Sequence, residues 1–273
     1  MSKTEELVEI TQNYYDSDDA DNFYHTVWGG EDIHVGLYNS DSDPIADASR
    51  RTVEQMTDLL NLTPETKILD IGAGYGGSAR YLAKNFGCKV VCLNLSEVEN
   101  QRNREKNAAQ GLDERIDVVQ GNFEDLPFED AQFDIVWSQD AILHSGEKEK
   151  VLHEVARVLK PEGDFIFTDP MQADDCPEGV LKPILERIHL KQLGSVKRYR
   201  KLAGKMGLQE KTVQELPHQL TRHYSRVLEE LEKHQNPEGI SEGYINRMKN
   251  GLRHWIEGGQ NNYLNWGILH FQK

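Results

Sequence analysis

Short apolar runs alternate with longer amphipathic segments through the middle of this chain, and this pattern predicts the fold. Five runs have the length and composition of buried strands, and they lie at 67–71, 89–93, 116–120, 133–138 and 164–168. The segments between them have helical spacing, at 78–85, 97–110 and 147–159. Such alternation predicts an α/β fold with a mostly parallel sheet and helices on both faces.

The pattern changes on either side of this region. Residues 1–60 are polar and largely helical, with an irregular stretch at 16–44 and helical spacing at 47–60. Beyond residue 170 the expected helices lie at 180–193, 196–206, 217–235 and 240–257, and the expected strands at 208–215 and 263–271. The sequence Lys-Pro-Glu-Gly at 160–163 predicts a turn. We therefore expect a single domain, 1–273, in which an N-terminal helical cap (1–60) and a C-terminal helical insertion (171–273) flank an α/β core (61–170).

The chain is strongly acidic. Its 46 Asp and Glu residues against 31 Lys and Arg residues give a formal net charge of -15, with a sequence pI of about 5.1 and a mean hydropathy of -0.67. These values argue against nucleic acid and anionic membranes as partners, because both attract basic patches. An acidic, hydrophilic surface suits a high-salt cytoplasm, although many ordinary bacterial proteins are acidic as well.

The cysteines and the N-terminus indicate a cytoplasmic protein. Cys88, Cys92 and Cys176 form no paired framework, and free thiols in a reducing compartment are the simplest interpretation. The N-terminus lacks a basic region followed by an apolar one, and the chain has no apolar run of about 18 residues. The histidines are scattered without ligand spacing, so we expect no metal site.

The first candidate ligand site is a glycine-rich loop after the first strand. Asp70 ends the apolar run, and Gly72, Gly74 and Gly76 follow at alternate positions. Glycines at a strand-to-helix turn let the backbone bend sharply and approach a ligand closely. Gly77 completes a G-x-G-x-x-G spacing, so the loop alone leaves a dinucleotide such as NAD open.

Three further strand ends carry polar residues, and ligands of open α/β sheets bind beyond these ends. After the second strand come Asn94 and Leu95, with Glu99 one turn into the next helix; a carboxylate here would hold ribose hydroxyls, although a solvated acid at a helix N-terminus is the simpler alternative. After the third strand, Asn122 and Phe123 suit an adenine, and after the fourth come Gln139 and His144. An acid that holds ribose hydroxyls is usual at this strand end, and Asn94 is neutral. This difference partly favours a nucleoside ligand over the dinucleotide NAD.

The order of these motifs, with Leu-Lys-Pro-Glu-Gly at 159–163, resembles that of the class I S-adenosylmethionine-dependent methyltransferases over residues 45–170. A narrower resemblance spans nearly the whole chain. The sequences at 94–96, 137–145, 168–171, 254–259 and 266–267 together resemble those of the sarcosine/dimethylglycine N-methyltransferases, which make glycine betaine. Glu99 departs from that pattern, because we expect Gln there in relatives.

The resemblance implies a Rossmann-like sheet, S-adenosyl-L-methionine as methyl donor, S-adenosyl-L-homocysteine as product and a small amine as substrate. The implied cofactor residues are Asp70, Gly72, Gly74, Gly76, Asn94, Leu95, Glu99, Asn122, Phe123 and Gln139. A cationic product calls for aromatic side chains, and a substrate carboxylate calls for arginine. The implied aromatic residues, of which Tyr24 is also implied in catalysis, are Tyr24, Trp28, Tyr38 and Tyr224. Arg187 is the first choice for the carboxylate and Arg200 the second, while His144 would accept a proton from the amine.

Pro170 and Met171 follow the fifth strand as an apolar pair. An apolar wall favours methylated amines over a primary amine, whose ammonium requires hydrogen bonds. Alternatives remain open: a methyltransferase for phosphoethanolamine or methionine, a non-catalytic S-adenosylmethionine-binding regulator and, more distantly, a lipid cyclopropane synthase or an NAD-dependent dehydrogenase. We expect a monomer or a weak homo-oligomer.

Overall fold

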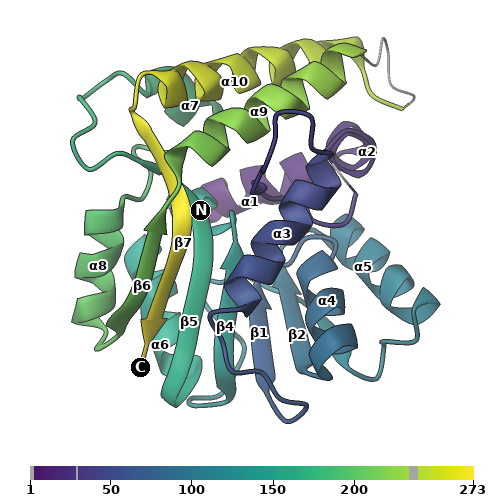
Figure 1. Cartoon of the computed structure of the whole chain (residues 1–273), viewed down its shortest axis with the longest axis vertical. Coiled ribbons are helices and arrows are strands. Elements are labelled where there is room, and N and C mark those ends of the chain that lie inside the picture. Colours follow the sequence, from purple (N-terminus) through teal and green to yellow (C-terminus); the bar gives the residue numbers. More distant parts are fainter. Residues whose placement is uncertain (1–2, 29, 234–238) are drawn as a thin grey trace.

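The computed structural model describes residues 3–28, 30–233 and 239–273, and it has a seven-stranded sheet at its centre (Figure 1). The strands are β1 (Lys67–Ile71), β2 (Lys89–Asn94), β3 (Ile116–Gln120), β4 (Phe133–Gln139), β5 (Leu159–Gln172), β6 (Gln209–Glu215) and β7 (Leu264–Gln272). Their order is β3-β2-β1-β4-β5-β7-β6. Strands β1 to β5 are parallel, whereas β7 runs antiparallel to both of its neighbours. The predicted α/β fold with a mostly parallel sheet is confirmed.

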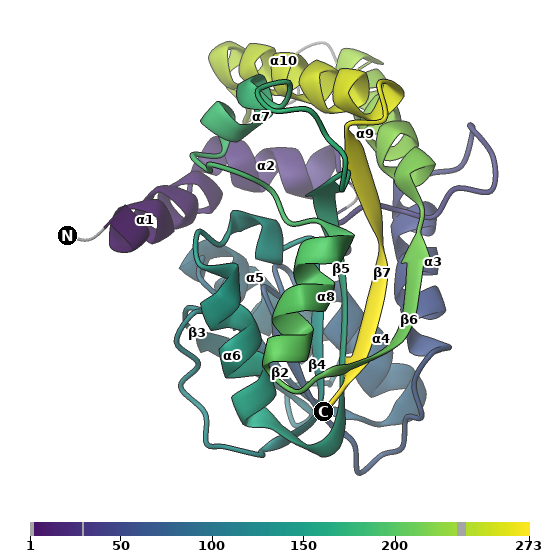
Figure 2. The ribbon, with the colours of Figure 1, turned by 90° about the vertical axis from the view of Figure 1, so that its left-hand side faces the viewer.

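Helices cover both faces of the sheet (Figure 2). One face carries α3 (Ile45–Thr57) and α4 (Gly77–Phe86), whose apolar side chains pack on β1 and β2 in one buried cluster. The opposite face carries α6 (Lys148–Val158) and α8 (Val196–Lys205), which pack on β4 and β5 in a second cluster. Both faces of the inner parallel strands β1, β4 and β5 are therefore largely buried, which explains their apolar sequences, whereas the edge strand β3 is buried only at Ile116.

A group of cap helices lies beyond the carboxyl ends of the parallel strands, at the top of Figure 1. They are α1 (Lys3–Tyr15), α2 (Asp18–Thr26), α7 (Lys182–Arg187), α9 (Pro217–Lys233) and α10 (Glu242–Gln260). Their apolar faces form a third cluster that includes Trp266 of β7. The remaining long helix, α5 (Glu97–Ala109), packs beside β2 and β3. No helix in the described ranges is long and apolar enough to cross a membrane.

Four local expectations need correction or refinement. The irregular stretch at 16–44 contains α2, whose start is capped by the Ser17 hydroxyl. The helix expected at 180–193 is only the short α7, and the helix expected at 217–235 ends at Lys233, so that its last two residues lie outside the described ranges. The turn at 160–163 lies inside β5, where Glu162 has a positive φ of 63° and the pairing with β4 shifts register. These residues form a bulge within one long strand.

Candidate active site

Two adjoining cavities lie at the carboxyl ends of the strands, as open α/β sheets require. The first, of about 90 Å³, lies over β1 to β4 and is called here the glycine-loop cavity. The second, of about 170 Å³, lies under the cap helices and is called the cap cavity. The side chains that line both are those of Thr11, Tyr15, Ile33, Asp140 and His144. A molecule in one cavity would therefore meet a molecule in the other at this junction.

The glycine loop is built by close backbone contacts. The Gly72 amide donates to the Leu93 carbonyl at 2.8 Å, and a Cβ atom on Gly72 would meet the Ala141 Cβ at 2.3 Å. Gly72 and Gly74 have φ angles of 81° and 50° and line the glycine-loop cavity. Gly76 lies apart from this cavity: it starts α4 at a φ of 74°, and a Cβ there would meet the Asn103 side chain of α5. Gly76 thus lets the start of α4 pack closely on α5, and its predicted contact with the cofactor stays a prediction.

Asp70 lies behind the loop at the end of β1, almost fully buried. Burial and the nearby Asp32 carboxylate raise its pKa to about 8. Both carboxyl groups line a third, smaller cavity next to Gly77, which adjoins the glycine-loop cavity through Gly72. A cation placed here would favour the ionised form of both acids.

Glu99 projects into the glycine-loop cavity because of a helix cap. The Ser96 hydroxyl accepts from the Glu99 amide at 3.1 Å and starts α5, and the Asn94 amide group donates to Glu99 Oε2 at 2.7 Å. Glu99 Oε1 is buried and has no partner among the described residues. Burial raises the pKa of this carboxyl to about 7. An unpartnered carboxylate oxygen beside an amide suits the hydroxyl pair of a ribose.

The raised pKa of Glu99 leads to a pH-dependent stability. The folded protein keeps a proton on Glu99 that the unfolded chain releases near pH 4.5, so folding stability falls as the pH rises from 4.5 to 7 and stays lower above 7. Glu99→Gln removes this loss. We expect the substitution to stabilise the ligand-free protein by about 1–2 kcal/mol more at pH 8 than at pH 5, measured by urea unfolding.

The matched control is Glu105→Gln, which changes an exposed acid on the same helix. Its effect should be the same at both pH values. A Glu99→Gln effect that does not vary with pH would contradict the assignment of a raised pKa to this group.

The other predicted residues of this cavity also face it. Leu95, Asn122 and Phe123 line it, and the largely buried Phe123 ring supplies an apolar wall for a planar base. Gln139 Oε1 accepts from Trp137 Nε1 at 3.0 Å and from the Ser78 hydroxyl. This fixes the amide so that Gln139 Nε2 is buried with no partner in the described part of the chain. Among the described residues that line this cavity, the buried side-chain atoms without a partner are thus an acceptor, Glu99 Oε1, and a donor, Gln139 Nε2.

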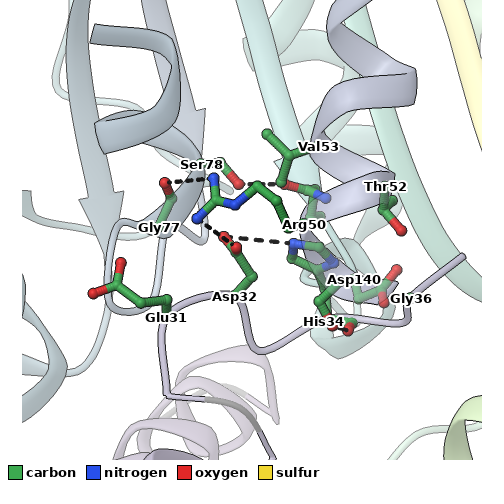
Figure 3. A network of polar contacts seen from close by, with 12 residues as sticks. Glu31, Asp32, His34, Gly36, Arg50, Thr52, Val53, Gly77, Ser78 and Asp140 are labelled. Atoms are coloured by element: carbon green, nitrogen blue, oxygen red, sulfur yellow. Dashed lines mark hydrogen bonds and ion pairs between the residues drawn. The ribbon is translucent and has the colours of Figure 1, made fainter. Parts of the chain in front are cut away.

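The loop between α2 and α3 passes close to Gly77 at the start of α4 (Figure 3). Arg50 of α3 forms an ion pair with Asp32 at 2.7 Å and donates to the Gly77 carbonyl at 3.4 Å, while the His34 ring lies 3.9 Å from the other Asp32 oxygen. This network holds Ile33 against Gly74, where a Cβ atom would be 3.2 Å from Ile33 Cδ1. The cap and the core are thereby joined at the cavity junction.

Aromatic rings form much of the cap cavity. Trp28 lies at their centre, with its ring centroid 5.3 Å from that of Tyr24 and 5.9 Å from that of Tyr224, which in turn lies 5.2 Å from Trp255. Burial raises the pKa of Tyr24 and of Tyr224, so both phenols stay protonated. Neutral aromatic faces that exclude water attract a bound cation. Tyr14 and Tyr15 of α1 add two further rings.

Arg187 brings a positive charge to this aromatic cavity. It is the last residue of α7, and it has no acidic ion-pair partner among the residues described. Its Nη2 contacts the Met248 sulfur at 2.7 Å, and its guanidinium packs so close to Gly251 that a Cβ there would overlap it. A guanidinium without an acid partner at an apolar wall is suited to receive a carboxylate.

Three predicted substrate residues lie elsewhere. Tyr38 is not part of the cap-cavity wall, because its hydroxyl is bonded to His223 Nδ1 at 2.9 Å within the packing of α9. Met171 is fully buried against the α6 and α8 side of the sheet, whereas its neighbour Pro170 lines the cavity, since successive strand residues face opposite sides. Arg200 is exposed and paired with Glu210 through bonds of 2.6 and 3.0 Å. The wall of the cap cavity instead includes Tyr14, Tyr15 and Met248, which the sequence interpretation did not name.

His144 and Tyr15 meet at the junction of the cavities. His144 ends a short 3₁₀ helix, η1 (Ile142–His144), and its Nε2 lies 3.0 Å from the Tyr15 hydroxyl. Burial, with a contribution from the Lys148 charge, lowers the pKa of His144 to about 4. The imidazole is therefore neutral at neutral pH and has a lone pair available. Tyr15 carried no sequence signal of its own, because helix α1 has no motif that fixes which of its residues face inward.

Asp140 is the second residue that the sequence interpretation missed at this junction. Its carboxylate accepts from the Val35 amide at 2.6 Å, the Thr168 hydroxyl at 2.7 Å and Trp266 Nε1 at 2.8 Å. Its φ is 50°, a left-handed conformation that is uncommon outside glycine. Burial raises its pKa. The sequence could have indicated Asp140 as a site residue, because it directly follows Gln139 at the end of β4.

Comparison with known proteins gives close matches. A family described as a methyltransferase domain matches residues 69–167. A sarcosine/dimethylglycine N-methyltransferase of Halorhodospira halochloris is 57% identical over 272 residues, covering 98% of each chain. A protein of the same name from Aphanothece halophytica is 54% identical and covers both chains fully.

A solved structure is also similar. The crystal structure of a protein from Galdieria sulphuraria, designated a sarcosine dimethylglycine methyltransferase, superposes with a TM-score of 0.89 at 47% identity. The match covers 93% of this chain and 98% of the other. The likeness therefore extends well beyond the sheet.

Proposed function

This chain belongs to the family of sarcosine/dimethylglycine N-methyltransferases, and we propose that it methylates sarcosine and N,N-dimethylglycine to form glycine betaine. Its fold is the Rossmann-like fold of the class I methyltransferases. It is an N-methyltransferase that uses S-adenosyl-L-methionine and releases S-adenosyl-L-homocysteine.

The glycine-loop cavity fits the methyl donor. When bound, S-adenosylmethionine supplies a methyl group on a positively charged sulfur. Glu99 Oε1 and the Asn94 amide group are placed to hold ribose hydroxyls, and Phe123 and Asn122 offer a wall and a polar edge to the adenine. The Asp70 carboxyl, behind Gly72, lies where it can order the loop. The unpartnered oxygen of Glu99 is the observation that supports this fit.

The single observation that carries the acceptor assignment is Arg187. Sarcosine and dimethylglycine each combine a carboxylate with an amine, and the cap cavity combines aromatic faces with a guanidinium that has no acid partner among the described residues. The guanidinium would bind the carboxylate, while Tyr24, Trp28 and Tyr224 would surround the amine and its cationic product. This arrangement presents the amine nitrogen toward the junction, and methyl transfer requires an approach of about 3 Å.

The neutral His144 would prepare the amine. The ammonium form of the acceptor has no lone pair, so it must lose a proton before it can attack a methyl group. His144 Nε2 lies 3.0 Å from the Tyr15 hydroxyl at the junction, so the amine proton would pass through that hydroxyl: its oxygen takes the proton from the amine while its own proton moves to Nε2. A tertiary amine releases no proton after transfer. Positioning therefore contributes more than proton transfer to the final methylation.

An acceptor series tests the proposal. We expect purified protein with S-adenosylmethionine to methylate sarcosine and dimethylglycine, and to act on glycine at least about tenfold more slowly, because a buried primary ammonium would leave N–H groups unpaired. The measurement is mass spectrometry of each amine, with initial rates. A higher rate on glycine would contradict the specificity, and no reaction on any of the three would contradict the acceptor class.

Phosphoethanolamine is the informative negative control. A phosphate favours several cationic partners, whereas Arg187 is the one Lys or Arg side chain among the described residues that line the cap cavity. Methylation of phosphoethanolamine at a rate similar to that of dimethylglycine would favour the alternative acceptor and require a second basic group.

We further propose a cytoplasmic enzyme that is a monomer or a weak homo-oligomer. Its three cysteines are free, as suits a reducing compartment. Among the described residues, Val98 and Val180 are the only large hydrophobic side chains that are exposed, so the described surface has no extended apolar patch for tight self-association.

A further inference from the structure

Lys148 is a buried lysine that lines neither the cap cavity nor the glycine-loop cavity. It is the first residue of α6, and its side chain is about 2% exposed. A buried ammonium is strongly unfavourable unless all its hydrogen-bonding capacity is used, so such a residue calls for an explanation. Burial lowers its pKa, and the nearby Asp169 carboxylate opposes that lowering.

The ammonium group is bonded to the backbone on both sides of His144. Lys148 Nζ donates to the Leu143 carbonyl at 3.1 Å and to the Ser145 carbonyl at 2.9 Å. These two carbonyls belong to the residues directly before and after His144. One side chain thus holds both ends of the peptide segment from which the imidazole projects into the junction.

Two buried acids hold the same segment from other sides. Asp169, fully buried, accepts from the Leu143 amide at 2.7 Å and from the Tyr199 hydroxyl at 2.5 Å. Glu124 accepts from the Ser145 hydroxyl at 2.6 Å. The positive charge of Lys148 lies among these carboxylates, which explains how it is tolerated in the interior.

We propose that Lys148 is a positioning residue for methyl transfer, which fixes His144 at the junction by holding the carbonyls of Leu143 and Ser145. This inference rests on the proposed function, because it assigns a purpose to the placement of His144. Without the ammonium, two buried carbonyls lose their donor, and the segment must shift to find water or another partner. A displacement of about 1 Å at a reacting group can reduce the rate about 100-fold.

The first test is Lys148→Met, which keeps the length of the side chain and removes its donors. We expect kcat for dimethylglycine to fall about 10- to 100-fold, while the affinity for S-adenosylmethionine changes by less than about threefold. Lys150→Met, an exposed lysine on the same helix, is the matched control and should leave kcat unchanged. An unchanged kcat in Lys148→Met would overturn the inference.

The second test separates positioning from general stability. In a His144→Gln background, which has already lost the imidazole, adding Lys148→Met should reduce kcat by less than about twofold, because the two residues act as one unit. An equal loss in both backgrounds would mean that Lys148 only supports the fold, which overturns the inference.

A third variant covers the case in which Lys148→Met does not fold. Lys148→Met with Asp169→Asn removes both charges and keeps an oxygen for the Leu143 amide, and we expect it to fold and to show the same loss of kcat. A double variant with the wild-type kcat would again overturn the inference. The proposed function is tested separately: inactivity of the unmodified enzyme on all amines would refute the function, whereas an active enzyme with full activity in His144→Gln would refute the role of His144 and with it that of Lys148.

Discussion

Replacing Arg187 with alanine is expected to reduce kcat/KM for dimethylglycine about 100- to 1000-fold, because Arg187 is the one Lys or Arg among the described residues that line this aromatic cavity, and the substrate carboxylate would lose it as a partner. Desolvated carboxylates depend strongly on such a partner, whereas exposed ion pairs contribute little. Steady-state kinetics at fixed, saturating S-adenosylmethionine would measure the effect. We expect most of it in KM, with a smaller loss in kcat.

The geometry at Arg187 also predicts the order of its replacements. Arg187→Lys keeps the charge but loses the planar, two-pronged donor group, so it should recover only part of the lost kcat/KM. Its shorter reach from α7 would also remove the contact with the Met248 sulfur. The affinity for S-adenosylmethionine, measured by calorimetry without acceptor, should stay within about threefold in both variants, because Arg187 does not line the glycine-loop cavity.

Arg200→Ala is the matched control, since the sequence interpretation ranked Arg200 second and the structure places it on the surface with Glu210. That variant should keep the wild-type kcat/KM. Two results would contradict the assignment: an Arg187→Ala enzyme that still has the wild-type KM, or an Arg200→Ala enzyme with the larger loss.

The sequence predicted the sheet well because the inner parallel strands β1, β4 and β5 are buried on both faces over most of their length. Such strands read as continuous apolar runs, and the turns and helix starts between them are marked by glycines, by Ser96 and by polar residues. The turn predicted at 160–163 was wrong because Pro and Gly normally end a strand. Here they form a bulge near the start of β5, and the strand continues beyond it. Local chemistry alone could not distinguish these two outcomes.

The candidate site was predictable only where the strand ends specify it. Glu99 and Phe123 were found because residues at strand ends must face the same edge of the sheet, whatever the helices do. The cap cavity depends instead on how α1, α7, α9 and α10 dock, and this is set by tertiary packing among residues far apart in the chain. Tyr38 and Met171 are of suitable residue types for the substrate site, but their side chains are buried in the core. Tyr15 was not predicted because the sequence does not show which face of its helix points inward.

Asp140 provides the second large effect. Asp140→Asn is expected to lower kcat/KM about 100-fold and to destabilise the ligand-free protein by about 1–3 kcal/mol. Both carboxylate oxygens now accept hydrogen bonds, so an amide nitrogen in place of either one would face an N–H or O–H donor. Asp140 also carries the one carboxylate among the described residues that line both cavities. During methyl transfer the positive charge moves from sulfur to nitrogen at this junction, so the loss of the negative charge would remove electrostatic stabilisation of the transition state.

Asparagine is a suitable probe because it tolerates the left-handed conformation of position 140 at least as well as aspartate, so backbone strain would not explain the loss. Thr168→Val separates the two contributions: it removes one donor to Asp140 but leaves its charge, and it should therefore destabilise the protein while reducing kcat/KM less than about tenfold. Urea unfolding and steady-state kinetics on the same preparations would measure both quantities. If Thr168→Val lowers kcat/KM as much as Asp140→Asn does, the loss comes from the hydrogen-bonded geometry of this carboxylate, and its charge has no separate role in methyl transfer.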